Sequence, residues 1–306
     1  MSLKSKAMLV QLNTSHWAAR KFDKKVTQEI DETHQAHESG RFNKTLIISD
    51  LLKDVSSAVS KARTYHYKVT MPWDDAGSRI LPVERYFDYT KKMEEFQTEH
   101  KNLVRLFLKE YPDLREKAKD RLNTLFNETD YPDTQTLSLK FNISYKITPI
   151  SDSDDLRVEL SNDEIKEIKK NIETGLYEKI NRAKDSLVER AEEAVLAMHE
   201  RLSNNEATFR DSLIGNVVSL KELLPSMNFD NDENFDKLEK LLSKLDVSPA
   251  KLRKDVELRE KTAKKAKKVL KKIRKMHYVT ETEPIVVVET EKKKDKKKTK
   301  RVKRIK

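Results

Sequence analysis

The sequence predicts a mainly α-helical protein with a small β component, and its composition is the first reason. Charged residues make up 38% of the 306 residues, whereas there are only four glycines and eight prolines. Globular proteins average about 25% charged residues. So many charges with so few helix-breaking residues favour long helices whose outer faces lie in water. We expect a long antiparallel two-helix stalk, similar to a coiled coil, with an embedded β-hairpin, a basic C-terminal helix and a disordered tail.

Composition also excludes several kinds of protein. The absence of cysteine rules out a disulfide framework, a cysteine nucleophile and any thiolate metal site. No stretch approaches the roughly 18 apolar residues that a membrane span needs. We therefore expect a soluble, cytoplasmic protein that does not interact with membranes.

Residues 1–81 predict an N-terminal mixed α/β segment. Apolar runs at 8–12 and 46–48 indicate short strands, and Ser49 or Asp50 can begin a helix that ends near Lys61. The alternation of aromatic and polar residues over 65–69 is typical of a strand. The stretch that follows, PWDDAGSRILP, predicts a loop with Gly77 as its turn residue.

Residues 82–202 predict two long helices around a β-hairpin at 137–160. The first helix begins at Pro82 and reaches about Phe126, with a break or kink at Pro112. Apolar residues at every second position over 137–147 indicate a strand, and 156–160 its partner. The second helix has an apolar stripe with a period of roughly 3.7 residues, which fits a nearly straight helix of about 60 Å. A helix of that length needs a partner, so we expect it to pair with the first.

The last third of the chain predicts three further segments. Residues 203–247 form short helices, with an acidic linker at 230–233. Residues 248–278 form a basic amphipathic helix that Ser248 caps and Pro249 begins. Residues 279–306 are a low-complexity basic tail that we expect to be disordered.

Positive charge is concentrated at the C-terminus. The net charge of residues 261–306 exceeds the +11 of the whole chain, so residues 1–260 are slightly acidic. The basic segment therefore reads as an appendage that can be separated from the fold. Such an appendage favours an anionic partner: nucleic acid, an acidic protein face or an anionic membrane surface.

Nonspecific nucleic-acid contact is the function that these lysines and arginines favour most. A basic helix and tail can contact phosphates without reading sequence, and no zinc finger, RNP-type motif or helix-turn-helix is present to read bases. The alternative is a solubilising face whose apolar side packs on the body. The candidate residues are Lys264, Lys265, Lys267, Lys268, Lys271, Lys272, Arg274, Lys275, Lys296, Lys297, Lys298, Lys300, Arg301, Lys303 and Arg304.

Other candidate sites are weaker. His34 and His37 could place two imidazoles on one helical face, but a metal site needs a third ligand. Trp73 and the nearby tyrosines predict packing at the head of the stalk, with Arg79 paired to a carboxylate. Because no P-loop, GxSxG, GxGxxG or HExxH motif occurs, we expect no enzyme activity, no catalytic residue, no cofactor and no bound metal.

Several stretches resemble a known family. They are MPWDDAGSRILPVERYFDYTKKMEEF, the two YPD repeats at Tyr111 and Tyr131, PISDSDDLRVEL and FRDSLIGN. Together they are similar to an uncharacterised protein family of phages and prophages, over about residues 65–245. The chain more loosely resembles proteins encoded beside MoxR-type AAA+ ATPases and von Willebrand factor A proteins. The first resemblance implies a phage context, with the host cytoplasm as location, and neither implies a catalytic residue.

Two functional hypotheses follow. In the first, the body forms oligomers or docks a protein while the basic helix and tail hold nucleic acid, most plausibly DNA, in replication, recombination or genome protection. In the second, the chain is an adaptor or scaffold whose stalk binds a protein such as an AAA+ ATPase, and the tail has no nucleic-acid role.

Overall fold

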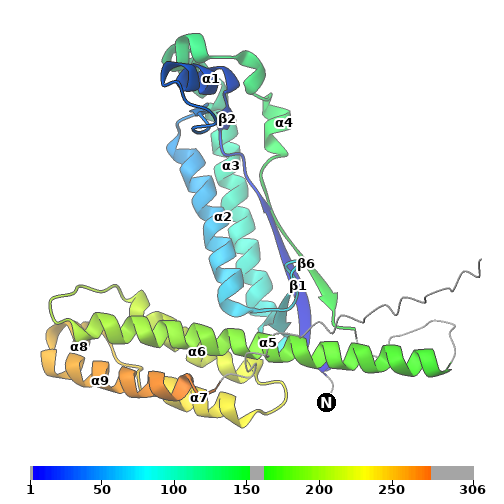
Figure 1. Cartoon of the computed structure of the whole chain (residues 1–306), viewed down its shortest axis with the longest axis vertical. Helices are drawn as coiled ribbons and strands as arrows, with labels where there is room; N and C mark the ends of the chain where they lie inside the picture. Colours follow the sequence, from blue (N-terminus) through cyan, green and yellow to red (C-terminus); the bar gives the residue numbers. More distant parts are fainter. Residues whose placement is uncertain (1–2, 152–161, 277–306) are drawn as a thin grey trace, which may run out of the picture.

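The computed structural model describes residues 3–151 and 162–276, which form two arms that meet at an angle (Figure 1). The first arm contains residues 3–151 and the second arm residues 162–276. The helices are α1 (Lys24–Thr33), α2 (Asp50–Val69), α3 (Tyr86–Leu122), α4 (Thr134–Ser138), α5 (Asn162–Ser203), α6 (Ser212–Met227), α7 (Glu233–Ser243), α8 (Pro249–Lys254) and α9 (Val256–Ile273). The strands are β1 (Ala7–Ser15), β2 (Arg20–Phe22), β3 (Asn43–Thr45), β4 (Met71–Pro72), β5 (Arg79–Pro82) and β6 (Asn142–Pro149). The prediction of a mainly helical chain with a small β component is confirmed.

The first arm is built on the pair α2 and α3, which pack along each other (Figure 1). Ser49 caps α2 by accepting a hydrogen bond from the backbone N–H of Leu52. The strand predicted at 65–69 is wrong, because α2 continues to Val69. The helical period explains the difference: it places His66 four residues after buried Ala62, on the face that packs against Tyr89 of α3.

A four-stranded antiparallel sheet in the order β4-β5-β1-β6 lies beside this helix pair. β1 pairs with β6 along its length, from Met8 opposite Pro149 to Ser15 opposite Asn142. The predicted loop contains strands β4 and β5, and the turn between them includes Gly77 at φ +90°, a conformation that favours glycine. The predicted turn residue is therefore confirmed, although the flanking residues are strands.

The predicted hairpin strand at 137–147 begins five residues later in the structure. Leu137 belongs to helix α4, which Asp133 caps by accepting from the N–H of Thr136, and Leu139 is 80% exposed. The helix that Asp133 caps therefore takes the place of the first part of the strand that the alternating pattern over 137–141 predicted. The strand itself, β6, pairs with β1. Its predicted partner at 156–160 lies outside the described residues.

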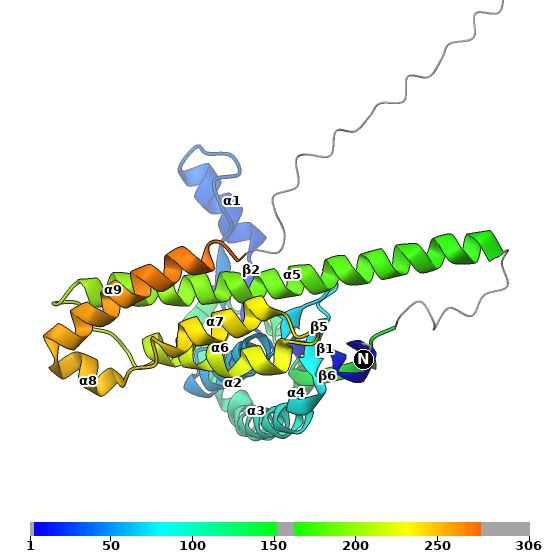
Figure 2. The same cartoon turned by 90° about the horizontal axis from the view of Figure 1, so that it is seen from below.

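The second arm is a bundle around α5, the longest described helix (Figure 2). Its C-terminal half buries Ala183, Leu187, Ala191, Val195, Met198 and Leu202. α5 packs against α9 and α6, whereas α3 packs against α2. The predicted pairing of the helix at 82–126 with the helix that follows the hairpin is therefore wrong. α3 also runs through Pro112 without ending.

The C-terminal segment differs from its prediction in two respects. The expected single basic helix is two helices, because Asp255 interrupts it and caps α9 by accepting from the N–H of Leu258. Ser248 makes no side-chain capping bond, although Pro249 does begin α8. The tail at 279–306 lies outside the described residues.

The two arms share one apolar cluster where they meet. Ala7, Met71 and Ile80 of the first arm pack with residues of α5 and α6. Cationic side chains connect the arms by donating to backbone carbonyls. Lys6 Nζ lies 2.6 Å from the carbonyl oxygen of Phe229, and Arg190 donates to that of Lys68 at 2.8 Å.

Candidate nucleic-acid interface

Helix α9 has one buried and one basic side. Ala263, Ala266, Val269, Leu270 and Ile273 are buried. Eight of the predicted basic residues are exposed here: Lys264, Lys265, Lys267, Lys268, Lys271 and Lys272 on the other side of α9, and Arg274 and Lys275 in the turn that follows it. α9 is therefore amphipathic, although it covers only part of the helix predicted at 248–278, and its apolar side packs on α5, as the alternative interpretation required.

The idea of a separable basic appendage needs correction. The buried side of α9 belongs to the core of the second arm, so deletion from Lys261 onward would remove core residues as well as charge. Arg259, which is 7% exposed, also ties α9 to the end of α5. Its guanidinium donates to the carbonyl oxygens of Arg201, Asn204, Asn205 and Ala207. The carbonyl of Arg201 is in the last turn of α5, where carbonyls lack partners within the helix, and the other three belong to the loop that follows.

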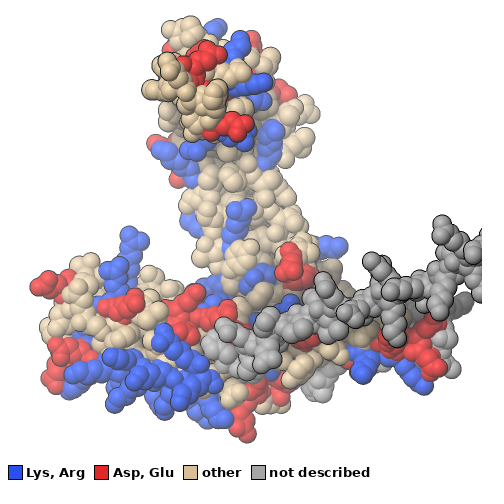
Figure 3. Space-filling model, viewed as in Figure 1, with Lys and Arg blue, Asp and Glu red and all other residues tan. Residues whose placement is uncertain are grey.

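Most of the exposed lysines on α9 have no acidic partner. Among the described residues, no carboxylate lies within ion-pair distance of Lys264, Lys265, Lys267, Lys268, Lys271, Lys272 or Lys275; we call these seven lysines the α9 basic face. Arg274 differs, because its Nε lies 2.7 Å from Glu192. Basic side chains gather over α9 on the surface (Figure 3).

A groove runs between α7 and α9, on one side of this face. It has a volume of about 410 Å³ and is lined by Leu241, Lys244, Lys265, Lys268, Val269 and Lys272; we call it the lysine groove. Lys244, the C-cap residue of α7, was not predicted from the sequence. Its sequence neighbours show no basic run, so only the packing of α7 beside α9 identifies it. The predicted residues Lys296, Lys297, Lys298, Lys300, Arg301, Lys303 and Arg304 lie outside the described residues.

The weaker candidate sites have structural roles. α1 ends at Thr33, so His34 and His37 do not share a helical face. In the described part of the chain no group of three or more histidine, aspartate or glutamate side chains could hold a metal ion. Arg79 donates to the hydroxyl and carbonyl of Thr70 and stacks on Tyr67, so its predicted carboxylate partner is wrong. Trp73 lies near α5, with Lys179 Nζ 5.3 Å from its ring centroid.

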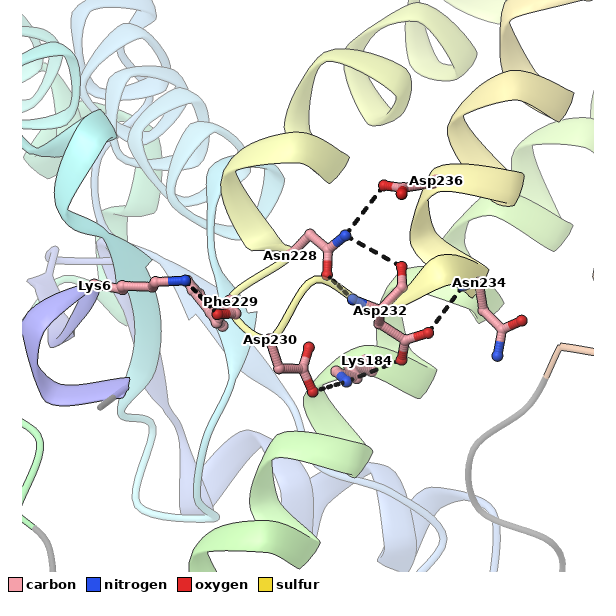
Figure 4. Close-up of polar contacts among 8 residues, drawn as sticks. All are labelled: Lys6, Lys184, Asn228, Phe229, Asp230, Asp232, Asn234 and Asp236. Carbon is pink, nitrogen blue, oxygen red and sulfur yellow. Dashed lines mark hydrogen bonds and ion pairs between the residues drawn. The ribbon is translucent and has the colours of Figure 1, made fainter. Parts of the chain in front are cut away.

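The predicted acidic linker at 230–233 binds a buried cation. Figure 4 shows Lys184 of α5 between two carboxylates of the α6–α7 connection. Lys184 Nζ lies 2.6 Å from Asp230 and 3.0 Å from Asp232, while Asp232 also caps α7. Its partners lie 46 and 48 residues away, so no local pattern could reveal the site.

Comparison with known proteins adds no assignment. No protein-family model, curated protein or solved structure matches the chain. Among the described residues, no helix is long and apolar enough to cross a membrane.

Proposed function

We propose that this protein binds nucleic acid nonspecifically through the α9 basic face, as an accessory in replication, recombination or genome protection in a phage-type context. One observation carries the proposal: seven exposed lysines, six on α9 and Lys275 in the turn after it, have no carboxylate partner among the described residues. Lysines that serve only solubility are commonly interspersed with acidic residues. From Lys261 to Lys275 the sequence contains no acidic residue.

The chemistry of this face defines how binding should behave. Lysines that neutralise phosphates release condensed counterions, so affinity falls steeply as salt rises. An ammonium group is a compact point charge on a flexible stem and lacks the rigid fork of a guanidinium, so it contacts phosphates with little geometric selectivity. We therefore expect binding that depends on charge and salt and not on base sequence. Residues 277–306 add further lysines and arginines that can contact the same polyanion.

The test is fluorescence anisotropy of labelled single- and double-stranded DNA titrated with the full chain at about 50 and about 200 mM salt. One variant carries Lys264→Glu, Lys267→Glu, Lys268→Glu and Lys271→Glu. The matched control carries Lys91→Glu, Lys101→Glu, Lys109→Glu and Lys117→Glu, four exposed lysines of α3 with the same change of charge. We expect the α9 variant to lose binding and the control to retain most of it. Equal losses would contradict a role for α9.

A truncated protein ending at Met276 separates the tail from the helix. This boundary retains α9 and the core residues that it buries. Binding that survives the truncation and disappears in the α9 variant supports the proposal. Binding that depends on the tail alone overturns it.

An adaptor role is the second candidate, and one observation favours it. The first turns of α5 project beyond the other described helices (Figure 2). They carry exposed Tyr177 and the half-buried Ile165, Ile168 and Ile172. A protein partner such as an AAA+ ATPase could cover this apolar stripe. A stoichiometric protein complex that is insensitive to salt, with no DNA binding at low salt, would favour this role.

A further inference from the structure

We infer that the lysine groove holds a single nucleic-acid strand, with its phosphates bound by lysines from both walls. This inference rests on the proposed function and assigns the binding to one part of the α9 basic face. The groove lies between α7 and α9, which are separated in the sequence by the short helix α8, and it depends on how these helices pack, so the sequence alone does not indicate it.

The lysines of α9 form two rows. Lys265, Lys268 and Lys272 are spaced three and four residues apart and line the groove. Lys264, Lys267 and Lys271 have the same spacing, are also exposed and do not line it. Side chains at three- and four-residue spacing share one helix face. α9 therefore presents a groove row and an outer row of equal charge.

The groove row faces a cation on the opposite wall. Lys244 lines the groove from the end of α7, and no lining residue is acidic. Asp246, two residues later, already binds Lys221 Nζ at 2.6 Å. Four ammonium groups around one groove repel each other, and an anion between them removes that repulsion. The outer row does not line this groove and has no second wall of lysines there, so we take the groove to be the stronger anion site.

The shape of the groove favours one strand over a duplex. Its floor is apolar, formed by Leu241 and Val269, and its volume of about 410 Å³ is within the range of small-ligand pockets. A duplex has a major groove of about 12 Å and a minor groove of about 6 Å, so its full width exceeds such a space. A single strand can place one or two nucleotides in the groove, with sugar C–H groups on the floor and phosphates at the walls.

Lysine footprinting tests the inference on the full chain. The protein is acetylated with a limiting amount of an amine-reactive reagent, with and without an oligo-dT strand, and each lysine is quantified by mass spectrometry. We expect Lys244, Lys265, Lys268 and Lys272 to be protected several-fold more than Lys264, Lys267 and Lys271. Equal protection of the two rows, or stronger protection of the outer row, would overturn the inference.

Two triple variants provide a matched measurement of affinity. The groove variant carries Lys265→Glu, Lys268→Glu and Lys272→Glu, and the outer variant carries Lys264→Glu, Lys267→Glu and Lys271→Glu. We expect about tenfold or greater loss of oligo-dT affinity in the first and a clearly smaller loss in the second. Equal losses overturn the groove inference and leave the proposed function intact. No binding of DNA by the unaltered chain at low salt overturns both.

Comparison with other polyanions identifies the occupant. The footprinting is repeated with duplex DNA and with polyglutamate, at concentrations of charge equal to that of oligo-dT. We expect each of them to protect the groove lysines less than oligo-dT does. If polyglutamate protects them equally, the groove is a site for any polyanion, and the strand assignment is wrong. If duplex DNA protects them equally, the argument from shape is wrong.

Discussion

Buried and exposed cations have different surroundings in this protein. Lys44 and Lys184 are almost fully buried, and each binds two carboxylates. Lys44 also donates to the carbonyl oxygen of Leu125 at 2.9 Å. Burying a charge is costly unless it is paired, so these two lysines have structural roles. The unpaired lysines of the α9 basic face are exposed and remain available to a ligand.

Removal of the Lys184 ammonium should destabilise the second arm. Lys184→Met removes the ammonium that Asp230 and Asp232 bind, and the side chain of Asp232 is only 17% exposed, so we expect the free energy of unfolding to fall by about 2 kcal/mol. Lys237→Met is the control, because Lys237 pairs with Glu233 on the surface and its loss should cost under about 0.5 kcal/mol. Urea denaturation measures both. Similar stabilities for the two variants would show that the buried pair contributes little.

Acid should destabilise the first arm through His66. Burial lowers the pKa of His66 to about 4, and the charge of Arg79 acts in the same direction. Below about pH 6.5 the unfolded chain binds a proton that the folded chain does not bind until about pH 4. The free energy of unfolding should therefore fall by roughly 3 kcal/mol as the pH falls through this window. Burial lowers the pKa of His100 as well, which adds to the effect.

Two measurements check this pH dependence. Urea denaturation from pH 7 to pH 4 should show a smaller loss of stability in His66→Gln than in the unaltered chain. NMR titration reports the pKa of His66 directly. An imidazole that titrates near 6.5 would contradict the account.

At the scale of single residues, the sequence predicted the exposed charges but not the buried contacts. A run of lysines without acidic neighbours is visible in any window, so most of the candidate residues on α9 could be predicted. Lys244 and Lys184 could not, because each acquires its role from residues of another segment that only the packing brings near it. The sequence also overestimated the availability of Arg274 for an anionic ligand, because its partner Glu192 lies 82 residues away.

At the scale of elements, Arg259 connects α9 to the end of α5. Its guanidinium reaches several carbonyls at once, which an ammonium group cannot do. Arg259→Met would leave these carbonyls without a donor, and we expect a loss of about 2–4 kcal/mol. Lys261→Met, on the exposed side of the same helix, should change stability by under about 0.5 kcal/mol. If thermal and urea unfolding do not distinguish the two variants, the capping role of Arg259 is wrong.

Helical periodicity predicted elements better than it predicted their partners. The stripes of α3, α5 and α9 are long and regular, so their existence follows from the sequence. Pairing depends on which apolar faces meet in space, and the chain pairs α2 with α3 and α5 with α9. Short alternating segments were less informative: residues 65–69 belong to a helix, and Leu137 lies in another.

At the scale of the whole molecule, the angle between the arms is defined by the shared apolar cluster and by cations that donate to carbonyls. Besides Lys6 and Arg190, Arg85 donates to the hydroxyl of Ser226 at 2.8 Å and to the carbonyl of Glu222. These contacts predict a fixed angle. Because the chain has no cysteine, spin labels can be placed at Glu110→Cys and Lys251→Cys without background.

Electron–electron double resonance between these labels should give one narrow distance distribution. Adding Arg85→Ala and Arg190→Ala should broaden it, because two of the connections between the arms are removed. A distribution that is already broad in the labelled chain would show that the arms move independently.

The central claim is that this protein binds nucleic acid by charge through the lysine groove, and the salt dependence of affinity tests it most directly. The dissociation constant for oligo-dT is measured across a salt series for the full chain and for a variant with Lys244, Lys265, Lys268 and Lys272 changed to glutamine. Each lost phosphate contact on a single strand should reduce the slope of log affinity against log salt by about 0.7, so we expect a reduction of about 3. An unchanged slope would show that these lysines do not contact phosphates and would contradict the account.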